Sequence, residues 1–271
     1  MTVRSSGNPI ARRRVPPVVL WFGAGLLSIV VTVLVSCPAS WMAVLLEKQT
    51  GGRLTLGDAQ GSLWHGSAFL GGAAGGNEPV TPLLPGRFEW HLSALVLLGH
   101  VDLLVENAQA LTQPLQVSGS WRSWQVSPAA ISLSATRLAG LGAPLNTVEP
   151  SGLMRLSWGP LQLARREAQL DVNGVVTLAL QDIASRMSPV KPLGSYQVRM
   201  DWHGTQATLQ LRTDRGPLLL SGNGAINNGR LVFSGIADAA AGQEDRLANL
   251  LNLLGQRRQI GAKNVIALEF K

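Results

Sequence analysis

The sequence has little charge, one tyrosine and one cysteine, and these shortages narrow the class of protein. Charged residues make up 14% of its 271 residues, against about 25% in an ordinary soluble domain. The lone cysteine, Cys37, excludes an intrachain disulfide, so packing has to stabilise the fold. Apolar residues are plentiful, at 46%, and there are 30 glycines. Few charges with many glycines favour a β-rich protein with many turns.

The net charge of +7 does not have the distribution of a nucleic-acid-binding protein. Arg4, Arg12, Arg13 and Arg14 supply four of the positive charges, and no acidic residue precedes Glu47. In the rest of the chain, basic and acidic residues are nearly balanced and form no cluster. A nucleic-acid interface needs a basic stripe or patch, so we expect no nucleic-acid partner.

Catalytic and metal-binding patterns are also missing from the sequence. The four histidines, His65, His91, His100 and His203, are scattered, and none lies three or four residues from another. Metal sites need ligands at short, regular spacing. The sequence has no Gly-x-Ser-x-Gly nucleophile motif, and its glycine-rich stretch lacks the Lys-Ser/Thr ending of a phosphate-binding loop. We therefore expect a protein that is not an enzyme, with no catalytic residues, no cofactor and no metal.

A long apolar run lies near the N-terminus. Residues 18–35 carry no charge, and a helix of that length spans roughly 27 Å, close to the thickness of a hydrocarbon core. Arginines precede the run and tryptophans stand near its ends, as at membrane interfaces. These expected anchor residues are Arg12, Arg13, Arg14, Trp21 and Trp41. The pattern predicts a cytoplasmic tail over 1–14, a transmembrane helix over 15–37, and the rest of the chain outside the inner membrane.

An alternative for this segment is a cleaved signal. The letters "LVSC", ending at Cys37, resemble a bacterial lipobox, in which the cysteine becomes a lipid-modified N-terminus. The apolar run is longer than the 7–15 residues of a usual signal, which favours a retained anchor. After the run, residues 38–52 have apolar side chains at helical spacing and end at Gly51 and Gly52. We expect a short helix there, lying at the membrane surface.

From residue 53 onward, apolar and polar residues alternate with a period of two. Clear examples are "HVDLLVEN" at 100–107, "SYQVRMDW" at 195–202 and "ATLQLRT" at 207–213. One apolar and one polar face is the mark of half-buried antiparallel strands. Turn signals separate the runs. The pattern predicts a mostly β protein, with one antiparallel domain over 53–271 that is a curled sheet or a sandwich.

One helix interrupts the predicted strands near the C-terminus. The stretch 241–258 has leucines at helical spacing, and we expect Gly255 to cap the helix. These leucines are Leu247, Leu250, Leu251 and Leu254. Because an exposed apolar stripe is unfavourable, we expect this helix to pack on its own sheet, followed by a last strand over 264–270. The Gly- and Pro-rich segment 71–86 predicts an irregular loop.

The stretch "LGDAQGSLWHGSAFL" places a large indole, Trp64, between Gly61 and Gly66. We interpret Leu54–Asp58 and Ser67–Leu70 as the two strands of a hairpin, with the glycines supplying positive φ angles at the bend. Buried aromatic side chains are more often core residues than ligand-binding ones. The stretch therefore predicts that the indole covers the start of the sheet.

Several motifs in a fixed order resemble one known family. The apolar segment is followed by "CPASW", "TGGRLTLGDAQGSLWHGSA" and "LLPGRFEWHL", and the C-terminal half contains "PLGSYQVRMDW", "LRTDRGPLLLSGNGAINNGRLVFSGIADA" and "LANLLNLLGQRR". Together they resemble protein N of the bacterial type II (general) secretion system. The motif positions, for which we expect structural roles, are Gly61, Trp64, Gly66, Gly194, Tyr196, Thr213, Gly216, Pro217, Leu218, Gly222, Gly224 and Gly235.

This resemblance implies a location and partners. It implies a single-pass accessory component in the cell inner membrane, with a periplasmic β-rich domain and a structural or assembly role in the export of folded proteins. Its partners would be other inner-membrane and periplasmic components of the secretion machine. A looser likeness, of strand and glycine pattern, is to the periplasmic sheets of AsmA-like proteins. That likeness implies an alternative function as a lipid-binding or lipid-transfer module.

Overall fold

The computed structural model of the chain describes residues 21, 25–26, 28–29, 32–52, 54–72, 81–141, 149–166, 169–260 and 263–270. The chain divides into two compact units, Met1–Cys37 and Pro38–Lys271. Among the described residues, no helix is both long and apolar enough to cross a membrane. The transmembrane helix expected over 15–37 falls largely on residues outside the described set, and the basic tail over 1–14 lies wholly outside it.

A short helix, α2 (Ser40–Thr50), precedes the first strand. It ends at Gly51, whose φ of 61° is the left-handed conformation of a C-cap glycine, as expected. The hydroxyl of Thr50 then accepts a hydrogen bond from the N–H of Leu54 at 3.1 Å, which ties the end of the helix to the sheet. The indole of Trp41 is exposed. The location of α2 at a membrane surface stays a prediction.

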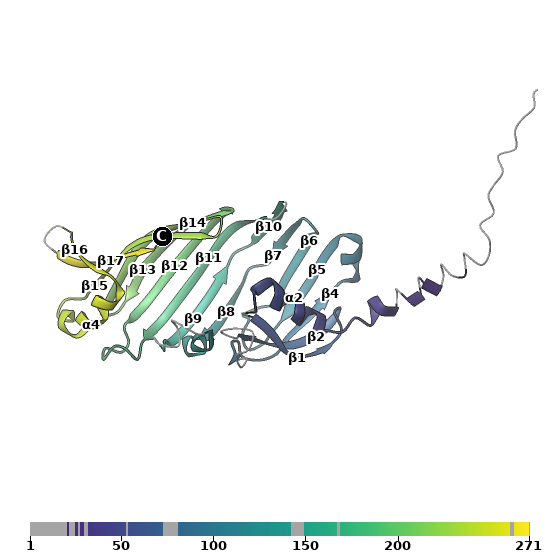
Figure 1. Cartoon of the computed structure of the whole chain (residues 1–271), viewed down its shortest axis with the longest axis horizontal. Coiled ribbons are helices and arrows are strands. Elements are labelled where there is room, and N and C mark those ends of the chain that lie inside the picture. Colours follow the sequence, from purple (N-terminus) through teal and green to yellow (C-terminus); the bar gives the residue numbers. More distant parts are fainter. Residues whose placement is uncertain are drawn as a thin grey trace, which may run out of the picture. The chain divides into compact units, whose positions relative to one another are not determined.

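The strands in the described part of the chain form one antiparallel sheet of 17 strands, shown in Figure 1. The bounds are β1 (Leu54–Gly61), β2 (His65–Gly72), β3 (Thr81–Pro82), β4 (Phe88–Leu92), β5 (His100–Glu106), β6 (Leu115–Ser120), β7 (Ser123–Val126), β8 (Ala129–Ser134), β9 (Ser151–Trp158), β10 (Leu161–Arg166), β11 (Gln169–Ala184), β12 (Gly194–Gly204), β13 (Gln206–Arg215), β14 (Leu218–Asn227), β15 (Arg230–Ala239), β16 (Gln256–Ile260) and β17 (Lys263–Phe270). The expectation of a mostly β, antiparallel domain is confirmed, and the sheet is open rather than a sandwich.

Most neighbours in this sheet are also neighbours in sequence. The pairing runs from β1 through β2, β4, β5 and β6 to β7, then from β10 and β11 to β15. Strand β11 is long enough to pair with β10 over its first residues and with β9 over the rest. The sheet is therefore a meander in which successive strands alternate in direction.

The C-terminal end departs from simple chain order. Helix α4 (Glu244–Leu254) follows β15, and β17 returns between β15 and the outer strand β16. The expected packing of this helix on its own sheet is confirmed, because Leu247 has an exposed fraction of 0%. Gly255 is the C-cap residue of the helix, as expected, but its φ of 176° is extended backbone and not the left-handed cap conformation. A Cβ there would collide with the carbonyl oxygen of Ala267, so close approach to β17 explains the glycine.

Two other segments differ from the expected pattern. After β8 the chain forms a 3₁₀ helix, η2 (Ala135–Leu141), inside the region in which alternation from residue 53 onward predicts strands. The expected loop 71–86 contains the two-residue strand β3, which pairs with Gly71 and Gly72, and the buried Leu83 and Leu84 follow it. Residues 73–80 of that loop lie outside the described residues.

The first hairpin explains why Trp64 stands between two glycines. Strands β1 and β2 pair as expected, and Trp64 is 8% exposed in the turn between them. Gly61 has a φ of 86°, which confirms the expected left-handed conformation. Gly66 does not have positive φ. A Cβ at Gly66 would collide with the ring of Trp90 and lie 2.7 Å from the carbonyl oxygen of Ser62, so this glycine makes room for packing.

The packing explanation for Gly66 can be tested by substituting two glycines of the same hairpin. Gly66→Ala places a methyl group against the Trp90 ring, and we expect a loss of about 1–3 kcal/mol in the free energy of unfolding. Gly57→Ala is the matched control, because the nearest atom to its Cβ is the Phe69 carbonyl oxygen at 4.0 Å. Denaturant unfolding measures both variants. Equal stability of the two would contradict the packing explanation.

Candidate functional site

The register of the central strands gathers apolar side chains on one face of the sheet. Residues directly opposite each other in an antiparallel pair lie on the same face. Val176 of β11 is opposite Trp158 on one side and Met200 on the other. Met200 is in turn opposite Leu209 of β13. Four neighbouring strands thus contribute one unbroken row of large apolar side chains.

Parallel rows extend this apolar face along the sheet. Leu178 is opposite Leu156 on β9 and Val198 on β12. Towards the other end, Val117 is opposite Leu103 on β5 and Val126 on β7. The rows lie two residues apart along each strand, as the side-chain period of two requires. We call this surface the apolar face; its most central members are Leu156, Trp158, Val176, Leu178, Val198, Met200 and Leu209.

A helix packs against the sheet at each end of the apolar face, as Figure 1 shows. Near the N-terminal end, Ala39 and Met42 from the α2 region pack with Ala68 and Trp90. At the other end, Leu247 of α4 packs among residues of β12, β14 and β15 and the loop before β12. That cluster consists of Val190, Leu193, Tyr196, Leu218, Ala239 and Leu247. Both ends of the face are therefore buried.

The middle of the apolar face has no such cover among the described residues. The central members are all only partly buried, and the buried clusters in the described part of the chain lie towards the two ends of the sheet. A sheet face of this kind in a soluble domain is normally buried against a second layer. Among the described residues, those between α2 and α4 therefore form an apolar surface several strands wide that is only partly buried.

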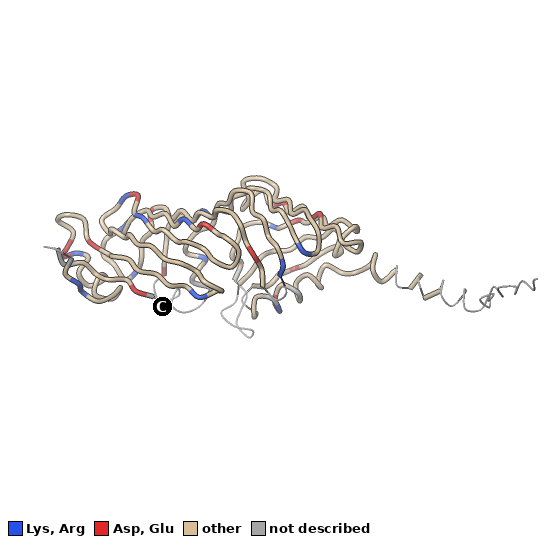
Figure 2. Tube along the Cα trace, turned by 90° about the horizontal axis from the view of Figure 1, so that it is seen from above, with Lys and Arg blue, Asp and Glu red and all other residues tan. Residues whose placement is uncertain are grey.

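The opposite face of the same strands is polar. Thr177 of β11 is opposite Ser157 and Arg199, and Gln210 of β13 is opposite Arg199. In Figure 2 the basic and acidic residues are scattered along the described part of the chain and do not gather into a stripe.

One group of the family-motif positions meets where β12 to β14 come together. The Tyr196 hydroxyl donates to the carbonyl of Leu218 at 3.2 Å. The hydroxyl of Thr213 donates a hydrogen bond to a backbone carbonyl of β14. A Cβ on Gly216 would collide with the Cα of Gly194, so both glycines permit close backbone contact. Burial raises the pKa of Tyr196 above its ordinary value. The positions that meet here are Gly194, Tyr196, Thr213, Gly216, Pro217 and Leu218.

The remaining C-terminal motif glycines surround one aromatic ring. A Cβ on Gly222 would lie 2.5 Å from the Phe233 ring, and one on Gly235 would lie 2.8 Å from it. Gly224 is directly opposite Phe233 in the pairing of β14 with β15. The ring therefore covers three strand glycines that have no side chain to pack. The other motif group, Gly61, Trp64 and Gly66, lies at the opposite end of the sheet beside Trp90.

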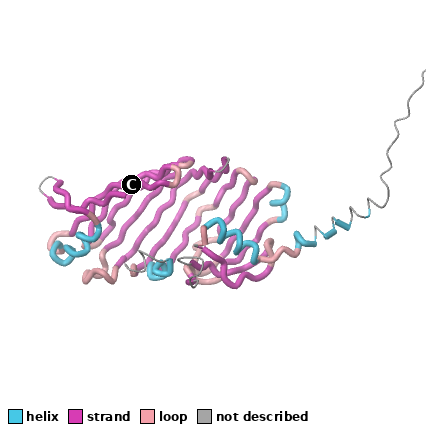
Figure 3. Tube along the Cα trace, in the orientation of Figure 1, coloured by secondary structure: helices cyan, strands magenta, loops and turns pink. Residues whose placement is uncertain are grey.

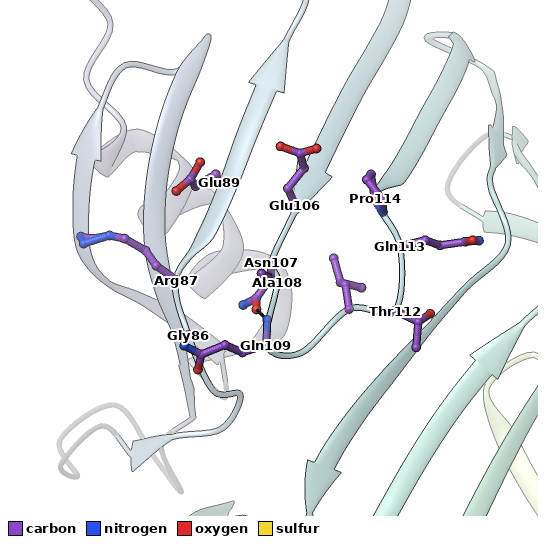
Figure 4. A pocket seen from close by; sticks show the side chains of 11 residues that line it. Gly86, Arg87, Glu89, Glu106, Asn107, Ala108, Gln109, Thr112, Gln113 and Pro114 are labelled. Atoms are coloured by element: carbon purple, nitrogen blue, oxygen red, sulfur yellow. Dashed lines mark hydrogen bonds between the residues drawn. The ribbon is translucent and has the colours of Figure 1, made fainter.

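An open polar pocket of about 600 Å³ lies beside β4 and β5, as Figure 4 shows. Glu89 and Glu106 are direct cross-strand neighbours there. The side-chain oxygen of Asn107 accepts from the N–H of Gln109 at 2.9 Å, so this amide holds its own loop. Arg87 pairs with a carboxylate of β1 at 2.7 Å. These polar groups serve the loop and the strands, and they do not converge on one point as a catalytic site requires.

The structure pairs two histidines that the sequence keeps far apart. His65 and His91 are directly opposite on β2 and β4, with ring centroids 3.9 Å apart in an edge-to-face arrangement. Only the strand register, which spacing in the sequence does not reveal, brings them together. His203 lies 3.7 Å from the carboxylate of Asp201. Within the described ranges, no three His, Cys, Asp or Glu residues gather in a way that could hold a metal ion.

Comparison with known proteins identifies one family. The family model described as type II secretion system, protein N, matches residues 52–265. This range covers nearly all of the sheet and both groups of motif positions. No curated protein and no solved structure matched the chain.

Because Tyr196 is the only tyrosine, its ionisation can be measured without mutation. Its pKa is raised in the folded state, so the unfolded chain ionises first, near the ordinary tyrosine pKa of about 10. The contribution of the protonated Tyr196 hydroxyl to stability is therefore fully present below the pKa of the unfolded chain. The free energy of unfolding falls as the pH rises above that pKa. We expect phenolate absorbance to appear above pH 10 only together with unfolding. Titration near the ordinary pKa in the folded chain would show that the hydroxyl is not buried.

Proposed function

The chain belongs to the protein N family of the type II secretion system, and we propose on this basis that it is an inner-membrane-anchored accessory component. Its role in this proposal is structural: it supports the assembly that exports folded proteins across the outer membrane. The N-terminus would be cytoplasmic, the segment 15–37 would span the inner membrane, and the β domain would face the periplasm. Its partners would be other inner-membrane and periplasmic components of the machine.

The observation that carries this proposal is the family match over 52–265, which coincides with a single continuous sheet. Polar side chains are spread along one face of that sheet, and within the described part of the chain no three His, Cys, Asp or Glu residues gather where they could hold a metal ion. Polar side chains that are distributed along one long sheet suit contact with other proteins better than catalysis, which needs groups that converge on one point. The family match supports a place in the type II secretion system, and the continuous sheet supports a structural role there.

Deletion and replacement of the anchor test the role and the location together. We expect deletion of the gene to reduce export of folded proteins, and the full chain to restore it. A variant with an unrelated transmembrane helix in place of residues 1–37 should restore export, because the anchor only needs to hold the domain. A variant with a cleaved signal there should not. The measurement is the fraction of exported protein outside the cell.

The intact mass of the extracted chain provides the control for this experiment. A chain that begins at Cys37 with attached acyl groups would replace the proposed anchor with a lipid. Unchanged export after deletion would remove the proposed role in secretion, whatever the anchor is.

A second candidate function is lipid binding along the apolar face. The observation that favours it is the set of partly buried, cross-strand apolar side chains between α2 and α4. Acyl chains are flexible and apolar, so they can cover such rows without needing hydrogen-bond partners. A protein segment on the same surface would have to satisfy its own backbone polar groups, as a helix does and as α2 and α4 do at the two ends of the face.

Photo-crosslinking from the two faces of one strand separates the candidates. A photoreactive phenylalanine replaces Met200 on the apolar face or Arg199 on the polar face of the full chain, and adducts are identified by mass spectrometry. Lipid binding predicts phospholipid adducts at Met200 and none at Arg199. Adducts with secretion proteins at Arg199 alone would support the first candidate and exclude lipid from the face.

A further inference from the structure

A second exposed apolar surface lies at one rim of the sheet, where β4 turns into β5 and β6 turns into β7. The turn between β4 and β5 is the 3₁₀ helix η1 (Ala94–Leu98), visible as a short helix in Figure 3. Its side chains Leu95, Leu97 and Leu98 are 54%, 48% and 76% exposed, and Trp121 in the neighbouring turn is 58% exposed. We call these four residues the rim cluster.

The fold holds the rim cluster in this exposed position. Ser93 accepts a hydrogen bond from the N–H of Leu95 at the start of η1, and Gly99 ends it with a φ of 94°. The indole N–H of Trp121 donates to the carbonyl of Val96, which fixes the tryptophan against the helix. The four side chains therefore form one patch, fixed by backbone hydrogen bonds.

Basic residues border the rim cluster. Arg122 follows Trp121 directly, and its carbonyl accepts a hydrogen bond from the N–H of Arg165 at 2.7 Å, which brings the end of β10 beside this turn. Both arginines are exposed. Arg166 pairs with Asp171 at 2.8 Å, whereas Arg122 and Arg165 form no ion pair with the described residues. Two positive charges are thus free to meet an anionic partner.

We propose that the rim cluster inserts into the surface of a phospholipid bilayer with anionic headgroups. Leucines with an indole, flanked by arginines, are the side chains that peripheral proteins place at the boundary of acyl chains and headgroups. A stable protein interface needs about 20–30 residues on each side, and four side chains fall far short of that. A bilayer needs no complementary shape, so a small patch suffices when a tether keeps it close.

This inference goes beyond the proposed function because it gives the β domain its own membrane contact. The anchor expected over 15–37 would supply the tether, and the rim cluster would then fix one rim of the sheet at the bilayer. The basic residues select the lipid class, since each arginine near an anionic surface adds to the attraction. The rim cluster shares no residue with the apolar face, so occupation of one does not require the other.

An environment-sensitive fluorophore at the rim tests the proposal on the full chain. The single cysteine is replaced by Cys37→Ser, and a nitrobenzoxadiazole label is attached after Leu98→Cys. The chain is reconstituted into vesicles of phosphatidylcholine with phosphatidylglycerol, or of phosphatidylcholine alone. We expect a blue-shifted, brighter emission in the anionic vesicles, and quenching by lipids that carry a bromine on the acyl chain.

The matched control carries the label after Met187→Cys, an exposed position in the loop between β11 and β12 at the opposite rim. It should stay water-exposed in both vesicles. Arg122→Gln in the Leu98-labelled chain should lower the ratio of inserted to free label roughly fivefold, the contribution of one arginine at an anionic surface. Circular dichroism confirms that each variant is folded.

Each outcome decides the proposal. Emission and quenching at Leu98 that match those at Met187 overturn it, and the rim cluster is then left for a protein partner. Insertion that is equal with and without the anionic lipid overturns the role of the arginines and leaves only an apolar contact. Insertion at Leu98 alone, weakened by Arg122→Gln, supports the full proposal, and it does so whether or not the chain acts in secretion.

Discussion

In the described part of the chain the sheet is one layer, whose apolar face no second sheet covers, and the other features of this domain follow from that constraint. The alternation along each strand would be stable in a sandwich, where two such faces bury each other. Here the described strands pair in one open sheet, and helices α2 and α4 pack against its two ends. The buried clusters of the described residues therefore lie towards the two ends of the sheet, and backbone hydrogen bonds and cross-strand contacts join them through the strands between.

The end clusters are stabilised by close contacts that only glycine permits. At the C-terminal end, Gly194 and Gly216 bring two backbones together beside the buried Tyr196, and the Phe233 ring covers the glycines of β14 and β15. At the N-terminal end, Gly66 admits the ring of Trp90. Every strand glycine lacks a side chain to pack, so an aromatic ring that lies over it restores the lost contact. This pairing of glycines with aromatic rings gives a structural reason for the strand glycines that lie beside Trp90 and Phe233.

Alternation and turn residues predicted many of the strands, because both act over a few residues, but they missed β3 in the expected loop and β16 at the end of the expected helical stretch. The hairpin around Trp64, the strands over 100–106 and 194–204, and the packed helix with Leu247 are all confirmed. The reasons for particular glycines were harder to predict. Gly66 and Gly255 were expected to serve turn and cap conformations, but they make room for residues far away in sequence, which local patterns do not reveal. The open sheet, the His65–His91 pair and the rows of the apolar face likewise depend on register between strands.

The separation of the two apolar surfaces bears on how such a domain can work. The apolar face lies on the broad side of the sheet, whereas the rim cluster lies at the tips of strands and is fixed by η1 and Trp121. An apolar face that is left open along several strands can accept a long, flexible occupant, and a small rigid tip can hold the sheet against a surface. The strands whose turns carry the rim cluster belong to the same continuous sheet as the apolar face. Fixing that rim at a surface would therefore also set the direction in which the apolar face points. In the two proposals, position and binding would be carried by different residues of one sheet, so either could change without loss of the other.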